Sequence, residues 1–180
     1  MYAVGRHEEQ LGVLEADLAT DVRFGAREEN ILLTKANLAL CYYKLGRHEH
    51  ALDLRREVYA RAVALNLPQR SQDAMNLASS MVATERWAEA KSLLREQLPA
   101  AQRALGADHD TVIHLRWIYA DSLRTDAGAS REDLVEAVTL LDELSRKTQR
   151  IYGTAYPLTC NLQGALGLAR EKLAAFDTSK

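Results

Sequence analysis

Histidine, cysteine and paired carboxylates are the side chains that most often do chemistry, and this chain arranges none of them in a recognisable site. His48 and His50 stand two residues apart at a turn and point in different directions, so they do not make a metal pair. Cys41 lies among Leu and Tyr, and Cys160 has no nearby His or Lys to activate its thiol. We therefore predict no catalytic residue, no metal site and no cofactor, and expect the protein not to be an enzyme.

Acidic pairs and glycines also have structural explanations. Glu8-Glu9, Glu28-Glu29 and Glu132-Asp133 recur near expected helix starts, where carboxylates complement the helix dipole. Gly164 and Gly167 fall inside an expected helix and lack the lysine of a P-loop, and no dinucleotide-binding fingerprint occurs. These residues therefore predict helix ends and helix interiors instead of a phosphate site.

The composition excludes several classes of protein. A net charge of −2, without basic runs that include aromatic residues, argues against nucleic-acid binding. No apolar stretch reaches the length of a transmembrane helix, so we expect no membrane insertion. The charged start is unlike a secretory signal, and two cysteines in 180 residues fit an intracellular, cytoplasmic protein with reduced thiols. Alanine and leucine greatly outnumber valine and isoleucine, which favours an all-helical fold.

Segments of the chain recur with a period near 41 to 42 residues, and one unit is longer because of a loop at Asp126–Ser130. The recurrences stay in phase, which is typical of a repeat protein. The recurring pairs are Gly5–Leu11 with Gly46–Leu52, Asn37–Ala39 with Asn76–Ala78, and Leu105–Thr111 with Tyr152–Leu158.

Each unit is predicted to contain two helices, because apolar residues recur at helical spacing between turn signals. Gly46 marks a helix end, and Pro99 inside an expected helix predicts a kink or a break. Small residues at 51, 90 and 137 mark close approaches between helices. Types that favour N-caps stand at Asn30, Ser71, Asp110 and Ser130. The expected helices are 7–24, 30–45, 48–66, 71–84, 87–105, 111–124, 131–152 and 158–173.

We expect one repeat domain over 1–180. The first expected helix lacks a preceding partner, of which only residues 1–4 remain, and the last lacks a following one. The chain thus reads as a fragment of a longer array, or as one whose ends a partner chain covers. The expected repeats are 1–29 (partial), 30–70, 71–110, 111–157 and 158–180 (partial).

The helix pairs, the turn Gly46-Arg47-His48 with Ala51, and linkers such as Leu105–Thr111 and Tyr152–Thr159 resemble the tetratricopeptide repeat of the kinesin-light-chain type. The resemblance covers about residues 5 to 173. It implies an α-solenoid, a right-handed superhelix of about four helix pairs. The first helix of each pair would line a concave groove that binds a peptide or a partner protein.

The resemblance also implies which residues face the groove. Asn37 and Asn76 match an asparagine that bonds the ligand main chain, although each could instead bond a neighbouring helix. Lys44 and Arg124 could bind an acidic group, while Met75 and Trp117 would supply apolar anchors, Trp117 alternatively being packed against the next repeat. The groove residues implied are Leu33, Asn37, Leu40, Tyr43, Lys44, Gln72, Met75, Asn76, Ser79, His114, Trp117, Asp121, Arg124 and Asn161.

The function expected is that of a non-catalytic scaffold or adaptor for protein–protein interaction. Two alternatives stay open at this point. The chain could be the regulatory or sensor segment of a larger enzyme, or a structural or assembly subunit of a multiprotein complex. A structural subunit would use its ends or its convex face instead of the groove. Repeats alone do not identify the partner.

Overall fold

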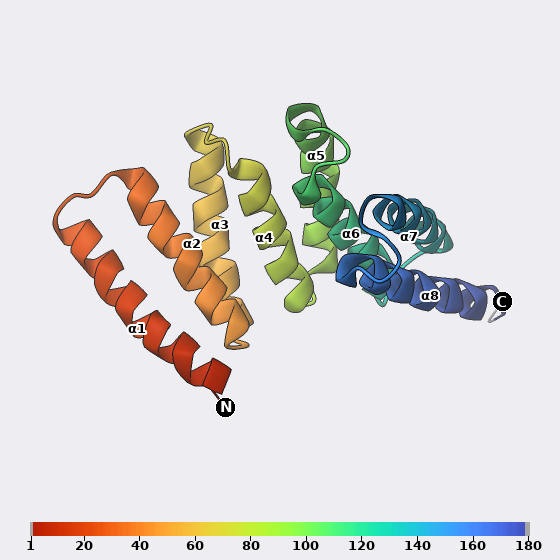
Figure 1. Ribbon diagram of the computed structural model, residues 1–180, viewed down its shortest axis with the longest axis horizontal. Coiled ribbons are helices and arrows are strands. Elements are labelled where there is room, and N and C mark those ends of the chain that lie inside the picture. The colour runs from red at the N-terminus through yellow and green to blue at the C-terminus, as the bar shows by residue number, and fades with distance from the viewer. Residues whose placement is uncertain (1, 179–180) are drawn as a thin grey trace. The chain divides into compact units, whose positions relative to one another are not determined.

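The structure, a computed structural model, describes residues 2–178, with side chains from residue 5 onward, and contains eight helices and no strand in that range (Figure 1). The all-helical class predicted from the sequence is thus confirmed. The helices are α1 (Tyr2–Arg23), α2 (Glu28–Lys44), α3 (His48–Ala64), α4 (Arg70–Ala83), α5 (Trp87–Leu105), α6 (Asp110–Thr125), α7 (Arg131–Tyr152) and α8 (Pro157–Thr178).

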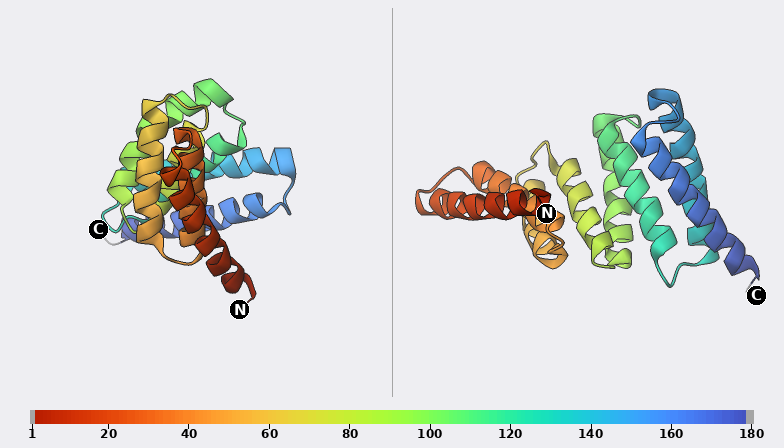
Figure 2. Two further views of the ribbon diagram at one scale, coloured as in Figure 1. Left: turned by 90° about the vertical axis from the view of Figure 1, so that its left-hand side faces the viewer. Right: turned by 60° about the horizontal axis from the view of Figure 1, so that its bottom comes forward.

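The chain divides into two compact units, unit 1 up to Thr84 and unit 2 from Glu85. In unit 1 each helix packs on the next, from α1 to α4. In unit 2 the same holds from α5 to α8, and α6 also contacts α8 (Figure 2). The boundary falls inside the repeat expected over 71–110, and the division of the chain into repeats stays a prediction.

Left-handed backbone ends several helices. At Gly46 (φ 75°) the N–H of Arg47 donates to the Tyr42 carbonyl at 2.9 Å, and the N–H of Gly46 donates to Tyr43 at 3.1 Å. This pair of bonds is the Schellman motif, which satisfies two carbonyls at the helix end and favours glycine. Asn66 and Glu85 also have positive φ, of 51° and 58°. Glu85 follows the last turn of α4 as Gly46 follows that of α2, without the freedom of a glycine.

The N-caps only partly follow the expectation. Ser130 caps α7 as predicted, in a capping box with Asp133 in which both hydrogen bonds measure 3.1 Å. The other three expected caps lie inside helices, because α2, α4 and α6 begin slightly earlier. At α6 the cap is His109, whose Nδ1 accepts from the N–H of Thr111 at 3.2 Å.

Two further expectations need correction. Residues 2–4 belong to α1 and are not the remnant of a preceding helix, because the helical run continues unbroken to Arg23. Met1, also assigned to that remnant, lies outside the described residues. Pro99 does not break α5, which runs from Trp87 to Leu105 with the proline inside it, so the break is corrected and the kink stays a prediction.

Each unit has its own core. Ala51 in unit 1 and Ala90 and Ala137 in unit 2 are fully buried, as their small size predicts for helix contacts. The main cluster of unit 2 joins α6, α7 and α8 through side chains such as Ile113, Leu141 and Leu162. This shared core fixes α6 beside α8, and the surface between these two helices is where the five groove residues expected in unit 2 gather.

Candidate functional site: the α6–α8 groove

One groove in unit 2 is built from two helix stripes. On α6 the residues that line the groove recur every three or four positions, which places them on one face of the helix. On α8 the matching stripe faces it across a shallow depression. We name this depression the α6–α8 groove; it is lined by Asp110, His114, Trp117, Asp121 and Arg124 of α6, by Tyr156 just before α8, and by Pro157, Leu158, Cys160, Asn161, Gly164, Ala165 and Leu168 of α8. All five groove residues predicted in unit 2 therefore lie together.

The opposite faces of α6 hold it in place. Tyr119 is buried and joins three helices: its hydroxyl accepts from Nε of Arg95 at 2.8 Å and donates to Glu136 at 3.0 Å. Burial is the first of the causes that raise the pKa of Tyr119. Arg116 of α6 also pairs with Glu143 of α7 at 2.6 Å. These contacts orient α6 so that the stripe of Trp117 faces α8.

The C-terminal end of the groove is closed by polar contacts. Lys172 of α8 donates to the carbonyl oxygens of Arg124 and Asp126 at 2.7 and 2.8 Å, which satisfies acceptors at the end of α6. Asp126 also pairs with Lys91 at 2.9 Å, and this ion pair, together with the N–H of Gly128, lowers the pKa of the Asp126 carboxyl. Arg124 itself forms an ion pair with Asp121 one turn away. The cation expected to bind an acidic ligand thus already has a carboxylate partner within the groove.

The N-terminal end of the groove is aromatic. The rings of His114 and Trp117 lie 6.1 Å apart, and Tyr156 stacks on Tyr152 with a centroid distance of 4.7 Å. Asp110 stands beside His114, whose Nδ1 lies 3.6 Å from the carboxylate. Trp117 packs with one part against the core and lines the groove with the rest. Trp117 is therefore packed against the next repeat and also has surface in the groove, and its role as an apolar anchor stays a prediction.

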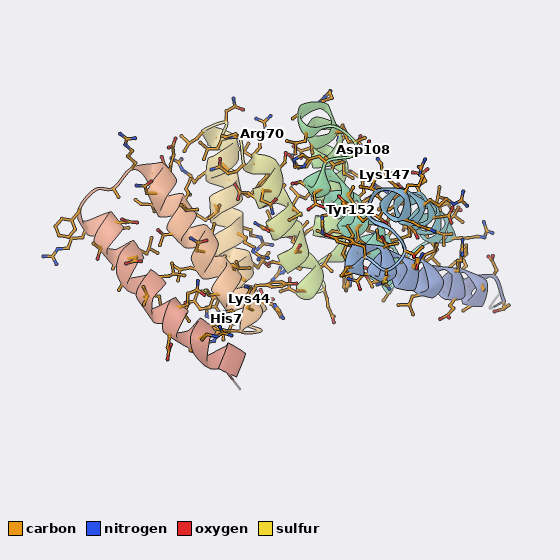
Figure 3. The ribbon with its side chains drawn as sticks, in the orientation of Figure 1. His7, Lys44, Arg70, Asp108, Lys147 and Tyr152 are labelled. Atoms are coloured by element: carbon orange, nitrogen blue, oxygen red, sulfur yellow. The ribbon has the colours of Figure 1, made fainter. Side chains whose placement is uncertain are left out.

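On α2 of unit 1 the predicted residues lie on exposed or half-buried surface. Leu33 and Leu40 expose 63% and 43% of their area, which is high for leucine, and Asn37 is exposed. Tyr43 is half-buried under the guanidinium of Arg55, 4.7 Å from the ring centroid. Figure 3 shows Lys44 at the C-terminal end of this helix.

On α4 several predicted residues are engaged within their own helix. Ser79 donates to the carbonyl of Met75 at 2.9 Å, and the side-chain amides of Gln72 and Asn76 lie 3.5 Å apart. Asn76 also lines a pocket that α2, α3 and α4 share, with room for about one water molecule. Of the fourteen groove residues implied by the sequence, Asn76 is the one that this pocket includes.

That pocket contains two charged residues that sequence reasoning missed. Arg55 of α3 is buried and donates to the Asn76 carbonyl at 2.7 Å and to the hydroxyl of Ser80 at 2.8 Å. Asp73 of α4 is 8% exposed, and its Oδ2 has no hydrogen-bond partner within the described chain. Burial raises the pKa of Asp73 to about 6. Neither residue stands in a motif, and their burial depends on helices distant in sequence.

The residues considered first for chemistry are apart from the groove, except one. His50 stacks on Tyr42 at 5.3 Å and His48 lies edge-on to Tyr43 at 5.0 Å, so the imidazoles face different rings. Among the residues that the structure describes, no three His, Cys, Asp or Glu side chains are placed to hold a metal ion. Cys41 is buried, whereas Cys160 is exposed and lines the α6–α8 groove.

Comparison with known proteins identifies the repeat. Residues 74–110 match the family model of the tetratricopeptide repeat, a span that includes most of α4 and all of α5. No curated protein sequence matches the chain at a significant level. Within residues 2–178, no helix is long and apolar enough to cross a membrane.

Solved structures share the fold over nearly the whole chain. A kinesin light chain-like protein from Podosopora anserina with nearly identical TPR-like repeats is 21% identical, with a TM-score of 0.77 over 95% of this chain and 80% of its own. A second crystal structure of that protein has a TM-score of 0.75, over 95% of this chain and 81% of its own. BtubC (BKLC) from P. vanneervenii is 15% identical, with a TM-score of 0.65 over 97% of this chain and 74% of its own. These likenesses confirm the predicted tetratricopeptide-type solenoid fold.

Proposed function

We propose that this chain, which has the tetratricopeptide-type fold, is a non-catalytic scaffold that binds a peptide segment of a partner protein in the α6–α8 groove. The partner is a protein, and the complex forms inside the cell, in the cytoplasm. Binding requires only complementarity between the segment and a preformed surface, with a few anchor residues giving most of the affinity.

One observation carries this proposal. The residues that line the groove combine an apolar anchor, an amide and charged groups on two helices that share a core. Trp117 provides the anchor, Asn161 offers a donor and an acceptor to a main chain, and the Asp121–Arg124 pair borders them. Because α6 and α8 are held by the core cluster and by Lys172, the surface exists before the partner arrives.

Site-specific crosslinking tests where the partner binds, because the chain has one exposed thiol and it lies in the groove. A benzophenone-maleimide reacts with Cys160 and spares the buried Cys41. The labelled protein is irradiated in lysate of the source cells, with and without excess unlabelled protein, and crosslinked proteins are identified by mass spectrometry. We expect one partner to be captured from Cys160 and displaced by the unlabelled competitor.

The matched control moves the label out of the groove. In the Cys160→Ser background, Gln149→Cys places the thiol on exposed surface of α7, away from the groove-lining residues. Capture from position 160 but not from 149 supports the groove. Equal capture of the same protein from both positions would instead favour a structural subunit held through other surfaces. A lack of any competed capture from position 160 would contradict the proposal.

A further inference from the structure

The α6–α8 groove contains a glycine that the fold does not require. Gly164 lies inside α8. Glycine stabilises a helix interior less than alanine does, because its backbone has more conformational freedom to lose on folding. The φ of Gly164 is not left-handed, and a Cβ built on it would meet no atom of the described chain within 4 Å. Because Gly164 has no side chain, the main chain of α8 is exposed at this point of the groove, and a ligand can approach it closely.

The groove also has an excess of negative charge. Of its charged lining residues, Asp121 is paired with Arg124, which leaves Asp110, whose carboxylate lies 3.6 Å from the His114 imidazole and is paired with no Lys or Arg of the groove lining. The side chain of Asp110 is 67% exposed and shares its end of the groove with Trp117 and Tyr156. A carboxylate beside aromatic faces is a favourable setting for an ammonium or guanidinium group.

We propose that the α6–α8 groove binds an extended basic segment, with the segment's main chain against Gly164 and a lysine or arginine side chain at Asp110, Trp117 and Tyr156. This inference rests on the proposed function and specifies the chemistry of the partner. Asn161 lies between the two contact points, one turn before Gly164, and its amide can bond the main chain that passes over it.

The spacing of the two contacts sets the spacing within the ligand. From Pro157 to Gly164 the helix rises by about 10 Å, at about 1.5 Å per residue. An extended peptide covers that length in about three residues, at about 3.3 Å each. The basic side chain should therefore stand about three positions from the small residue that crosses Gly164.

The test uses a phage-displayed library of random linear decapeptides, selected on the full chain. Clones that also bind Asn161→Trp are discarded, because this exposed position in the middle of the groove is blocked there without disturbing the core. Selected peptides are synthesised, and their dissociation constants are measured by fluorescence anisotropy. We expect lysine or arginine to be enriched three positions from a small residue.

Two matched pairs of variants locate the contacts. Gly164→Ala should weaken binding about tenfold or more, whereas Gly167→Ala, in the same helix but outside the groove lining, should leave binding unchanged. Asp110→Asn should weaken binding about three- to tenfold, whereas Asp108→Asn should not. Asp108 is two residues away and pairs with Lys147 of α7 (Figure 3). Circular dichroism should show both glycine variants at least as stable as the wild type.

The outcomes separate this inference from the function on which it rests. Selected groove-binding peptides that are acidic, or that bind Gly164→Ala as tightly as Gly167→Ala, would overturn the inference and leave the groove a peptide site. A selection that yields no peptide sensitive to Asn161→Trp would contradict a linear-segment site, and the inference would fall with it. Basic peptides whose binding weakens in Gly164→Ala and Asp110→Asn, but not in the control variants Gly167→Ala and Asp108→Asn, support both the inference and the proposed function.

Discussion

Asp73 is a buried carboxylate whose charge is poorly satisfied in the folded state. Its Oδ2 has no partner among the described atoms, and burial raises the pKa of the group from 3.8 to about 6. The folded state therefore holds the proton more tightly than the unfolded state. The stabilisation from this proton is fully present below about pH 3.8 and is lost as the pH rises through about 6.

Replacing this carboxylate should therefore stabilise the protein at neutral pH. We expect Asp73→Asn to raise the free energy of unfolding at pH 7.5 by about 1–3 kcal/mol, since each pKa unit corresponds to about 1.4 kcal/mol. The gain should shrink as the pH is lowered from 7.5 to 4, because the wild-type carboxyl is then neutral too. Urea denaturation at several pH values measures this difference.

A control for this prediction lies on the neighbouring helix. Asp53→Asn changes an exposed carboxylate of α3 and should alter the unfolding free energy little at any of these pH values. A gain in Asp73→Asn that stayed constant with pH would show that titration of this carboxyl is not its cause.

At the scale of the helix, the end of α4 stores conformational strain. Glu85 holds φ 58°, and a side chain in the left-handed region costs about 1–2 kcal/mol relative to glycine. We expect Glu85→Gly to raise the melting temperature by a few degrees, consistent with a gain of about 1 kcal/mol. Thermal unfolding followed by circular dichroism measures it.

The equivalent position after α2 supplies the opposite substitution. Gly46 has φ 75°, and Gly46→Ala should lower stability by about 1 kcal/mol for the same reason. Changes of the same sign in the two variants would mean that backbone strain does not dominate at these helix ends.

The helices were predictable because their signals are local. Apolar spacing and the glycine at 46 placed the interiors and one end of α2 correctly. The N-caps were less predictable, since the Nδ1 of His109 can replace a Ser or Asp oxygen as the acceptor. Asp73 was not predictable at all, because its burial is produced by α2 and α3, whose contacts no local pattern encodes. The groove positions in unit 2 followed from the family resemblance, whereas their ion pairing required the structure.

At the scale of the whole molecule, the division into two units predicts separable stability. Ala51 belongs to the core of unit 1 and Ala137 to that of unit 2, and both are fully buried. Tryptophan at either position overpacks a helix contact and should cost about 1–3 kcal/mol. We expect Ala51→Trp to lower amide protection mainly up to Thr84, and Ala137→Trp to lower it mainly from Glu85 onward.

Hydrogen exchange followed by mass spectrometry resolves the two regions, and Ala→Ser at the same positions provides milder matched variants. In the wild type we expect the terminal helices α1 and α8 to exchange fastest, as ends of repeat proteins do. Equal loss of protection in both units from a single tryptophan would show that the chain unfolds as one cooperative body.

The two tryptophans give the protein an intrinsic optical probe. Trp117 lines the α6–α8 groove, whereas Trp87 begins α5 and is not among the groove-lining residues. In a Trp87→Phe variant, all tryptophan fluorescence would come from Trp117 in the groove. Its emission maximum should shift to shorter wavelength when a ligand removes water from the indole, so that occupancy can be followed in real time without any attached dye.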